Sequence, residues 1–165
     1  MISRNLLSKN EADLIRSVRL FNDNAYNNSP LAISHDVWPE LQNIIRKLIC
    51  LIQESDPFVV NLKHLNEETV SIFELQVLYV IESLRCGREG TTIEILKWWL
   101  PSVKIKKALC LVRTITYILD EIEIETPRPD RLTRYILGIT EARLRKQRFR
   151  VIEGGRSGTC PQTLH

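Results

Sequence analysis

The side chains best suited to binding chemistry are arginines, and they are concentrated in the last quarter of the chain. Residues 128–165 hold nine cations, eight of them arginine, against three carboxylates, a net charge of +6. The whole chain carries +3, so residues 1–127 carry −3. The planar guanidinium group donates paired hydrogen bonds to phosphates and carboxylates. This asymmetry predicts an anionic partner but does not identify it.

Catalytic groups and metal ligands show no recognisable spacing. The three histidines, His35, His64 and His165, are far apart and fall in predicted loop, connector or tail positions. The sequence has no H-E-x-x-H, EF-hand, P-loop or G-x-S-x-G pattern. Glu67 and Glu68 are better explained as helix-start residues than as a catalytic pair. We therefore expect a non-enzymatic protein without metal or cofactor, although distant residues can still converge in space.

The four cysteines, Cys50, Cys86, Cys110 and Cys160, include no C-x-x-C pair. Cys50 and Cys110 fall in apolar helical runs and are expected to be small buried hydrophobes, which fits a reducing compartment. Residues 1–5 lack the features of a signal peptide, and no stretch approaches 18 apolar residues. We expect a cytoplasmic protein with no membrane contact.

The length and hydrophobic pattern predict one helical domain. A chain of 165 residues, 44% hydrophobic and 26% charged, is ordinary for a globular protein. At this size about 70% of the surface of the unfolded chain can be buried. Apolar residues recur at helical spacing in six segments: residues 8–26, 36–54, 72–86, 92–100, 103–121 and a last helix from 130 to about 150.

Three predicted helices begin with capping-box spacing, in which a Ser or Thr and a Glu three residues later satisfy two backbone N–H groups. The pairs are Ser8 with Glu11, Ser71 with Glu74, and Thr91 with Glu94. Asn66 is a second candidate start for the third helix.

The remaining helix ends are predicted from single residues. Ser34 or Asp36 can cap the second helix, with Pro39 in its first turn, and Ser102 can cap the fifth. Gly87 and Pro101 are expected to end the third and fourth helices.

Two short segments stay open between alternatives. Residues 57–65 are expected to form a connector, although residues 58–60 have strand-like composition without an obvious partner. Residues 122–125 alternate with period two, so they form either a frayed helix end or a short edge strand.

The last predicted helix changes character along its length. Leu132, Ile136 and Ile139 form an apolar stripe that, continued, meets cations after about residue 142. Unpaired buried charges cost several kcal/mol each, so the helix must leave the body there or lie against acidic groups. The cations that we expect to bind a partner are Arg143, Arg145, Lys146, Arg148 and Arg150.

Three interpretations of this basic segment compete. It is a solvated helix end that pairs with the acidic run at 120–125, a contact for a protein with an acidic groove, or a nucleic-acid contact.

The third to fifth helices form a compact three-helix unit that invites comparison with a helix-turn-helix. Phosphate contacts would come from Lys104, Lys106, Lys107 and Arg113. The short junction at 101–102 lacks the usual glycine-containing turn, and the fifth helix offers lysines rather than a cluster that reads bases. We therefore favour ordinary helix packing for this unit.

Trp98 and Trp99 are adjacent on a predicted helix, where neighbouring side chains point about 100° apart. Both indoles cannot easily enter one core. One is expected to remain partly exposed and to anchor a protein contact, or to cover a neighbouring helix while its N–H finds a carbonyl.

The sequence thus predicts an all-α fold: a single helical domain over residues 1–150, with five or six helices, a basic C-terminal helix and a mobile tail over 151–165. The expected function is that of a non-enzymatic regulatory or adaptor protein that binds a protein partner with an acidic surface. The alternative is a nucleic-acid-binding regulator. No small-molecule substrate is evident.

Overall fold

The computed structural model describes residues 2–3, 7–23, 37–124 and 136. Within these residues five helices form an all-α domain, as predicted: α1 (Lys9–Asp23), α2 (Trp38–Gln53), α3 (Ile72–Arg85), α4 (Glu89–Trp99) and α5 (Ser102–Glu121). Two short strands, β1 (Ile2–Ser3) and β2 (Thr69–Val70), pair antiparallel with Ile2 opposite Val70. Two-residue strands carry no periodicity, so this pairing could not be read from the sequence.

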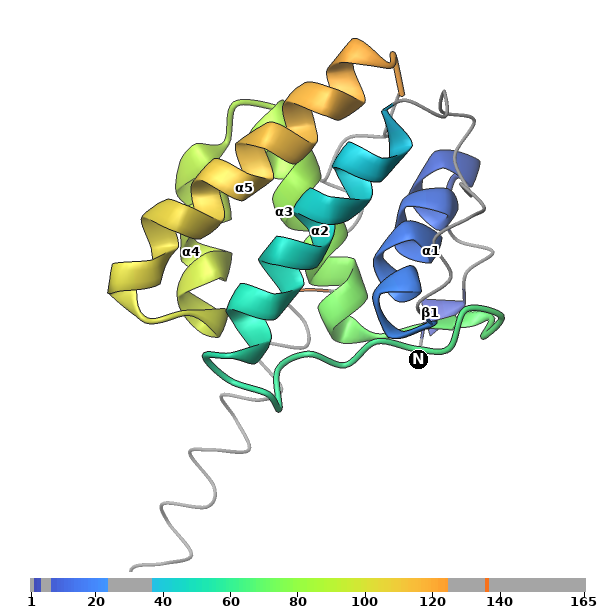
Figure 1. Cartoon of the computed structure of the whole chain (residues 1–165), viewed down its shortest axis with the longest axis horizontal. Helices are drawn as coiled ribbons and strands as arrows, with labels where there is room; N and C mark the ends of the chain where they lie inside the picture. Colours follow the sequence, from blue (N-terminus) through green and yellow to red (C-terminus); the bar gives the residue numbers. More distant parts are fainter. Residues whose placement is uncertain (1, 4–6, 24–36, 125–135, 137–165) are drawn as a thin grey trace, which may run out of the picture.

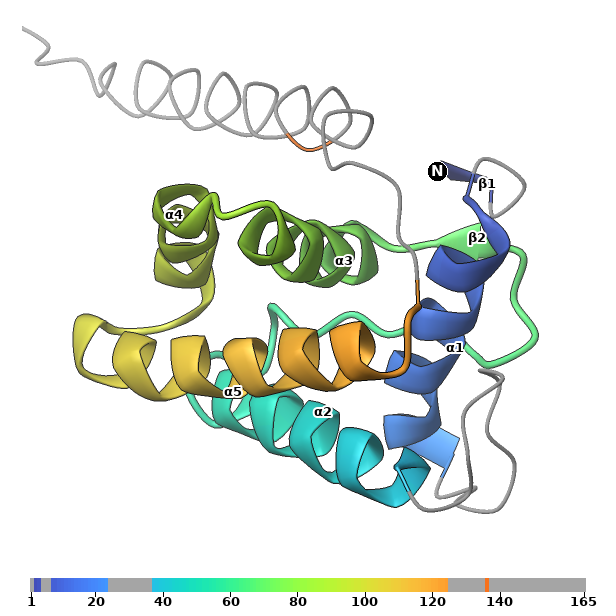
Figure 2. The same cartoon turned by 90° about the horizontal axis from the view of Figure 1, so that it is seen from above.

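Helix α3 is the centre of the domain. It contacts α1, α4 and α5, while α2 contacts α1 and α5 (Figure 1 and Figure 2). Every residue from 73 to 83 is buried. A helix that is buried on all sides is a core helix, and the amphipathic helices around it supply apolar faces. The buried stripe of α1 includes Leu14, Ile15 and Val18, as its spacing predicted.

Two of the three predicted capping boxes are present. The Glu11 N–H donates to Ser8 Oγ at 3.3 Å, and the Ser8 N–H donates back to the Glu11 carboxylate. The Glu74 N–H donates to Ser71 Oγ at 3.1 Å, and the Ser71 N–H donates to Glu74 Oε2 at 2.8 Å. Of the two candidate starts for α3, Ser71 is therefore correct and Asn66 is wrong.

The third capping box, Thr91 with Glu94, is wrong because α4 begins earlier, at Glu89. Gly87 ends α3 with a φ of +73°, and the Arg88 N–H donates to the Ser83 carbonyl at 2.8 Å. This hydrogen-bonded turn reverses the chain at once, so the next helix starts directly after it.

The other helix starts shift by a residue or two. The N-terminal cap of α5 is Pro101, with Ser102 already helical. The cap of α2 is Val37, which makes no side-chain hydrogen bond, and Pro39 lies in the first turn as expected. The predicted caps Ser34 and Asp36 lie outside the described residues.

The structure describes the first open segment in full and the second one up to Ile124. Residues 57–65 form a connector and residues 58–60 form no strand. After α5 the Ile124 N–H donates to the Leu119 carbonyl at 3.1 Å, and Glu123 has a φ of +52°. The chain after α5 therefore leaves the helix through a left-handed terminating turn, not through an edge strand.

Neither of the two cysteines that were expected to be buried is fully buried. Cys50 is half-buried, but Cys110 is exposed because it lies on the side of α5 opposite Ala108 and Val112. Cys86 is exposed, and all three are free thiols. No helix in the described part of the chain is long and apolar enough to cross a membrane.

Ile136 is the one described residue of the predicted last helix, and it is buried and belongs to the core cluster. The rest of that helix, the domain boundary at 150 and the tail over 151–165 lie outside the described residues. So do the cations predicted to bind a partner: Arg143, Arg145, Lys146, Arg148 and Arg150.

Candidate interaction surface and the buried ion pair

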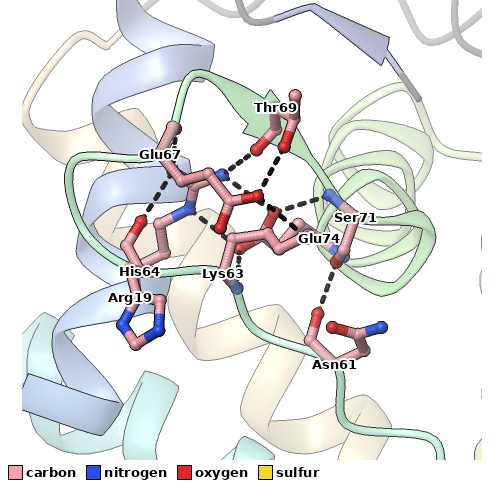
Figure 3. Close-up of polar contacts among 8 residues, drawn as sticks. All are labelled: Arg19, Asn61, Lys63, His64, Glu67, Thr69, Ser71 and Glu74. Carbon is pink, nitrogen blue, oxygen red and sulfur yellow. Dashed lines mark hydrogen bonds and ion pairs between the residues drawn. The ribbon is translucent and has the colours of Figure 1, made fainter.

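The most elaborate polar site among the described residues centres on Arg19 of α1, which is fully buried (Figure 3). Its Nε and Nη2 donate to the two carboxylate oxygens of Glu74 at 2.8 and 3.0 Å. Nη1 donates to the His64 and Glu67 carbonyls at 3.1 and 2.6 Å, and Nη2 donates to the Thr69 carbonyl at 2.7 Å. A guanidinium group has five N–H donors, and each of them has a partner here.

Each carboxylate oxygen of Glu74 likewise accepts two hydrogen bonds. Its Oε1 also accepts from the Lys63 N–H at 2.9 Å, and its Oε2 also accepts from the Ser71 N–H at 2.8 Å. The Ser71 hydroxyl in turn donates to the Asn61 carbonyl (Figure 3). A buried ion pair is tolerated when additional hydrogen bonds of this kind satisfy both groups. The Arg19–Glu74 network therefore fastens the connector before α3 to α1 and α3.

This arrangement leaves the network without an evident catalytic function. His64 contributes its backbone carbonyl, while its side chain is exposed. No cysteine in the described part of the chain takes part in the hydrogen bonds of the network. Because the donors of Arg19 and the oxygens of Glu74 are occupied by the protein itself, no free hydrogen-bonding group of this pair faces a substrate.

Only one part of this network could be predicted from the sequence. The Ser71–Glu74 capping box was visible from its spacing, but the partner of Glu74 was not. One signal was available: Arg19 follows Ile15 by four residues and so lies on the apolar face of α1. A cation in that position requires a buried partner, which only the tertiary fold supplies.

Glu67 lies at the edge of the network and does not start a helix. Its carboxylate is 2.9 Å from Lys63 Nζ and accepts the Thr69 hydroxyl at 2.7 Å. These two side-chain hydrogen bonds, Lys63 first, lower the pKa of Glu67 from 4.5 to about 2. A carboxylate with so low a pKa is a poor general base near neutral pH, and it closes the turn before β2.

The tryptophan pair divides between the core and the surface. Trp99 is 4% exposed, its indole N–H donates to Gln76 Oε1 at 3.2 Å, and its ring centroid is 5.3 Å from that of Phe73. Trp98 is 43% exposed. The expectation that the two indoles separate is confirmed. Trp99 is not accessible to a partner, so of the two tryptophans Trp98 is the one that can take part in a surface contact.

The four cations predicted to contact phosphate fall into two pairs. Lys104 Nζ lies 3.0 Å from Ser55 Oγ and 3.9 Å from the Glu54 carboxylate, and Arg113 forms an ion pair with Glu89 at 2.7 Å. Lys106 and Lys107 are exposed, and neither forms an ion pair with a described residue. The fold thus neutralises two of the four cations.

Among the described residues four large apolar side chains are exposed, and three of them lie toward the same end of the helical domain; the fourth, Tyr117, lies farther along α5. Phe58 is 94% exposed, Val103 88% and Trp98 43%. The contact between Lys104 and Ser55 joins the start of α5 to the segment after α2, so Val103 and Phe58 lie at the same end as the α4–α5 junction (Figure 1). We call Phe58, Trp98 and Val103 the apolar end.

Within the described residues, no three His, Cys, Asp or Glu side chains are grouped closely enough to hold a metal ion. Comparison of the chain with protein-family models, with curated proteins and with solved structures returned no match.

Proposed function

We propose that this protein is a non-enzymatic adaptor or regulatory protein, and that its apolar end binds a protein partner with an acidic surface. The observation that carries the proposal is the exposure of Trp98 beside the fully packed Trp99. Tryptophan is enriched among the residues that dominate binding energy, because its large ring is desolvated when a partner covers it.

The composition of the apolar end supports a protein contact. Isolated exposed apolar residues are common, whereas several at one place mark interaction sites. Phe58 lies in the connector after α2, and Val103 lies in the first turn of α5. No element in the described part of the chain covers either position, so both side chains are available to a partner.

The charges around the apolar end favour an acidic partner. Lys106 and Lys107 are exposed one turn beyond Val103. The segment with Arg143, Arg145, Lys146, Arg148 and Arg150 remains the predicted second contact. The free thiols Cys50, Cys86 and Cys110 fit a reducing, cytoplasmic setting.

Selection of displayed random peptides on the full-length protein tests the proposal without a known partner. We expect enrichment of peptides that combine Asp or Glu with Trp, Phe or Leu. A synthetic copy of an enriched peptide should bind the Trp98→Ala variant at least about tenfold more weakly, as measured by calorimetry.

The matched control is Tyr117→Ala. Tyr117 is 64% exposed but lies 14 residues along α5 from Val103, about 20 Å away. This variant should bind the peptide like the wild type. Equal peptide affinity of the Trp98→Ala and wild-type proteins, or no enrichment at all, would contradict the proposal.

A titration with generic duplex and single-stranded DNA at two salt concentrations tests the nucleic-acid alternative. Binding that weakens steeply with salt, and that Trp98→Ala leaves unchanged, would replace the proposal by phosphate recognition. An absence of DNA binding at low salt would remove the alternative.

A further inference from the structure

Helix α5 presents a face to solvent along its whole length. The outward residues are Val103, Lys106, Lys107, Cys110, Arg113, Tyr117, Asp120 and Glu121, all exposed, with Thr114 half-buried among them. The opposite side, including Val112 and Ile115, packs into the core. We call the outward residues the outer face of α5.

The outer face has the spacing of a coiled-coil seam. Val103, Cys110 and Tyr117 recur every seven residues, and Lys107, Thr114 and Glu121 recur every seven residues beside them. Two helices pack along each other through two such columns when both are apolar. Here the first column is largely apolar and the second is polar, so a contact along this face depends on charge as well as on apolar packing. Within this domain, no described element covers these residues.

Charge divides the outer face into two halves. Lys106 and Lys107 lie near the start of α5, while Asp120 and Glu121 lie at its end. Asp120 already forms an ion pair with Arg85, with 2.6 Å between Asp120 Oδ1 and Arg85 Nη2. Glu121 forms no ion pair with a described residue. Two copies of such a helix attract each other when antiparallel and repel each other when parallel.

The middle of the outer face is compatible with a close approach of two copies. Arg113 would lie near its own symmetry mate, but its charge is neutralised by Glu89 at 2.7 Å within each chain. Cys110 and Thr114 are small, so they allow two helix backbones to lie near each other. Tyr117 supplies a large apolar surface on each side of the centre.

From this pattern we propose that the outer face of α5 binds a second copy of the chain. The two α5 helices run antiparallel about a two-fold axis near residues 112–114. A two-fold axis requires a surface that is complementary to itself, and a face with one basic and one acidic half meets this requirement. An acidic partner protein would match only the lysine half.

The association is expected to be weak. A single pair of helices buries less surface than the roughly 1,200–2,000 Å² of a stable protein–protein interface. Dimer formation should therefore depend on protein concentration and weaken when salt rises from about 0.05 to about 0.5 M, because the charges are exposed.

Charge reversal measured by analytical ultracentrifugation tests the proposal. Lys107→Glu and Glu121→Lys should each weaken the dimer about tenfold, since each places like charges across the axis. The double variant should recover to within about threefold of the wild type, because the charge pair is restored with its signs exchanged. Lys9→Glu, an exposed change on α1, is the control and should leave the dimer unchanged.

Cross-linking locates the axis. A short bismaleimide should link two wild-type chains through Cys110, so Cys110→Ser should abolish the product and Cys86→Ser, at the other described exposed thiol, should keep it. A monomer at every concentration, or a dimer that both charge reversals leave intact, would overturn the proposal. Val103, Lys106 and Lys107 belong to both proposed surfaces, so a second copy and an acidic partner compete for them. Trp98 belongs to the apolar end alone, so Trp98→Ala should weaken peptide binding and leave the dimer unchanged, which distinguishes the two tests.

Discussion

The Arg19–Glu74 network and the apolar end reverse the usual distribution of polar and apolar groups. In the network, a complete ion pair lies inside the protein, with both side chains fully buried. At the apolar end, the apolar side chains of Phe58, Val103 and Trp98 are exposed to solvent. One region places charge where solvent is absent, and the other places apolar surface where solvent is abundant.

The two regions should therefore contribute differently to the stability of the domain and to the binding of a partner. A buried charge that loses its partner retains its desolvation cost, so the network must remain complete for the domain to be stable. An exposed apolar side chain gains little from folding, because its surface stays in water. The network should therefore control stability, and the apolar end should control binding.

Removal of Glu74 should have the largest effect. Glu74→Ala leaves the Arg19 guanidinium buried without its counter-charge and removes the carboxylate that accepts the Ser71 N–H, so the free energy of unfolding should fall by about 3–5 kcal/mol. Urea denaturation followed by circular dichroism measures this loss.

The control is the surface ion pair between Arg113 and Glu89, whose side chains are 58% and 44% exposed. Glu89→Ala should cost no more than about 1 kcal/mol. If Glu74→Ala and Glu89→Ala cost the same, the network does not stabilise the fold as we argue.

The two tryptophans give the next largest contrast. Trp99→Phe removes the N–H that Gln76 accepts and leaves space in the core, so it should destabilise the domain by about 1–3 kcal/mol. Trp98→Phe should change stability by less than about 0.5 kcal/mol. Thermal unfolding of the two variants compares them under identical conditions, and equal shifts would remove the distinction between core and surface.

The left-handed turn after α5 provides a smaller effect outside both regions. Glu123 has a φ of +52°, a conformation that glycine adopts without steric cost. Glu123→Gly should raise the free energy of unfolding by about 0.5–1 kcal/mol. Gly87→Ala, at the matching turn after α3 with a φ of +73°, should lower it by a similar amount. A loss of stability in Glu123→Gly would show that the carboxylate of Glu123, and not its backbone, matters.

The smallest effect is expected at the solvated edge of the network. Because the pKa of Glu67 is lowered to about 2 by Lys63 and Thr69, its ionised form favours the folded state. This contribution is complete above pH 4.5 and is lost as the pH falls toward 2. Glu67→Gln should therefore flatten the decline in stability between these pH values, as followed by urea denaturation at several acidic pH values. An unchanged pH profile would show that the Lys63–Glu67 contact has no energetic role.

Features that depend on interactions between residues close in the chain could be predicted from the sequence. The apolar stripes, two capping boxes, Gly87 and the divergence of Trp98 and Trp99 all depend on helix geometry, and all appear in the structure. The missed features depend on distance along the chain: Arg19 meets Glu74 across 55 positions, and β1 meets β2 across more than 60. Periodicity carries no information about such pairings.

The surface was predicted less well than the core. Cys110 was expected to be buried because it lies in an apolar run, yet it faces solvent between Lys106 and Arg113. The sequence also gave no reason to associate Phe58 with Val103, since only the contact between Lys104 and Ser55 joins their segments. The face of a helix that meets its neighbours is fixed by the packing of all the helices.

The most direct test combines stability and binding in one variant, Trp98→Ala. We expect its free energy of unfolding to lie within about 0.5 kcal/mol of the wild type, and its affinity for the selected acidic peptide to fall at least about tenfold. If Trp98→Ala unfolds as readily as Glu74→Ala, or binds the peptide as tightly as the wild type, Trp98 is not a surface residue that serves binding alone.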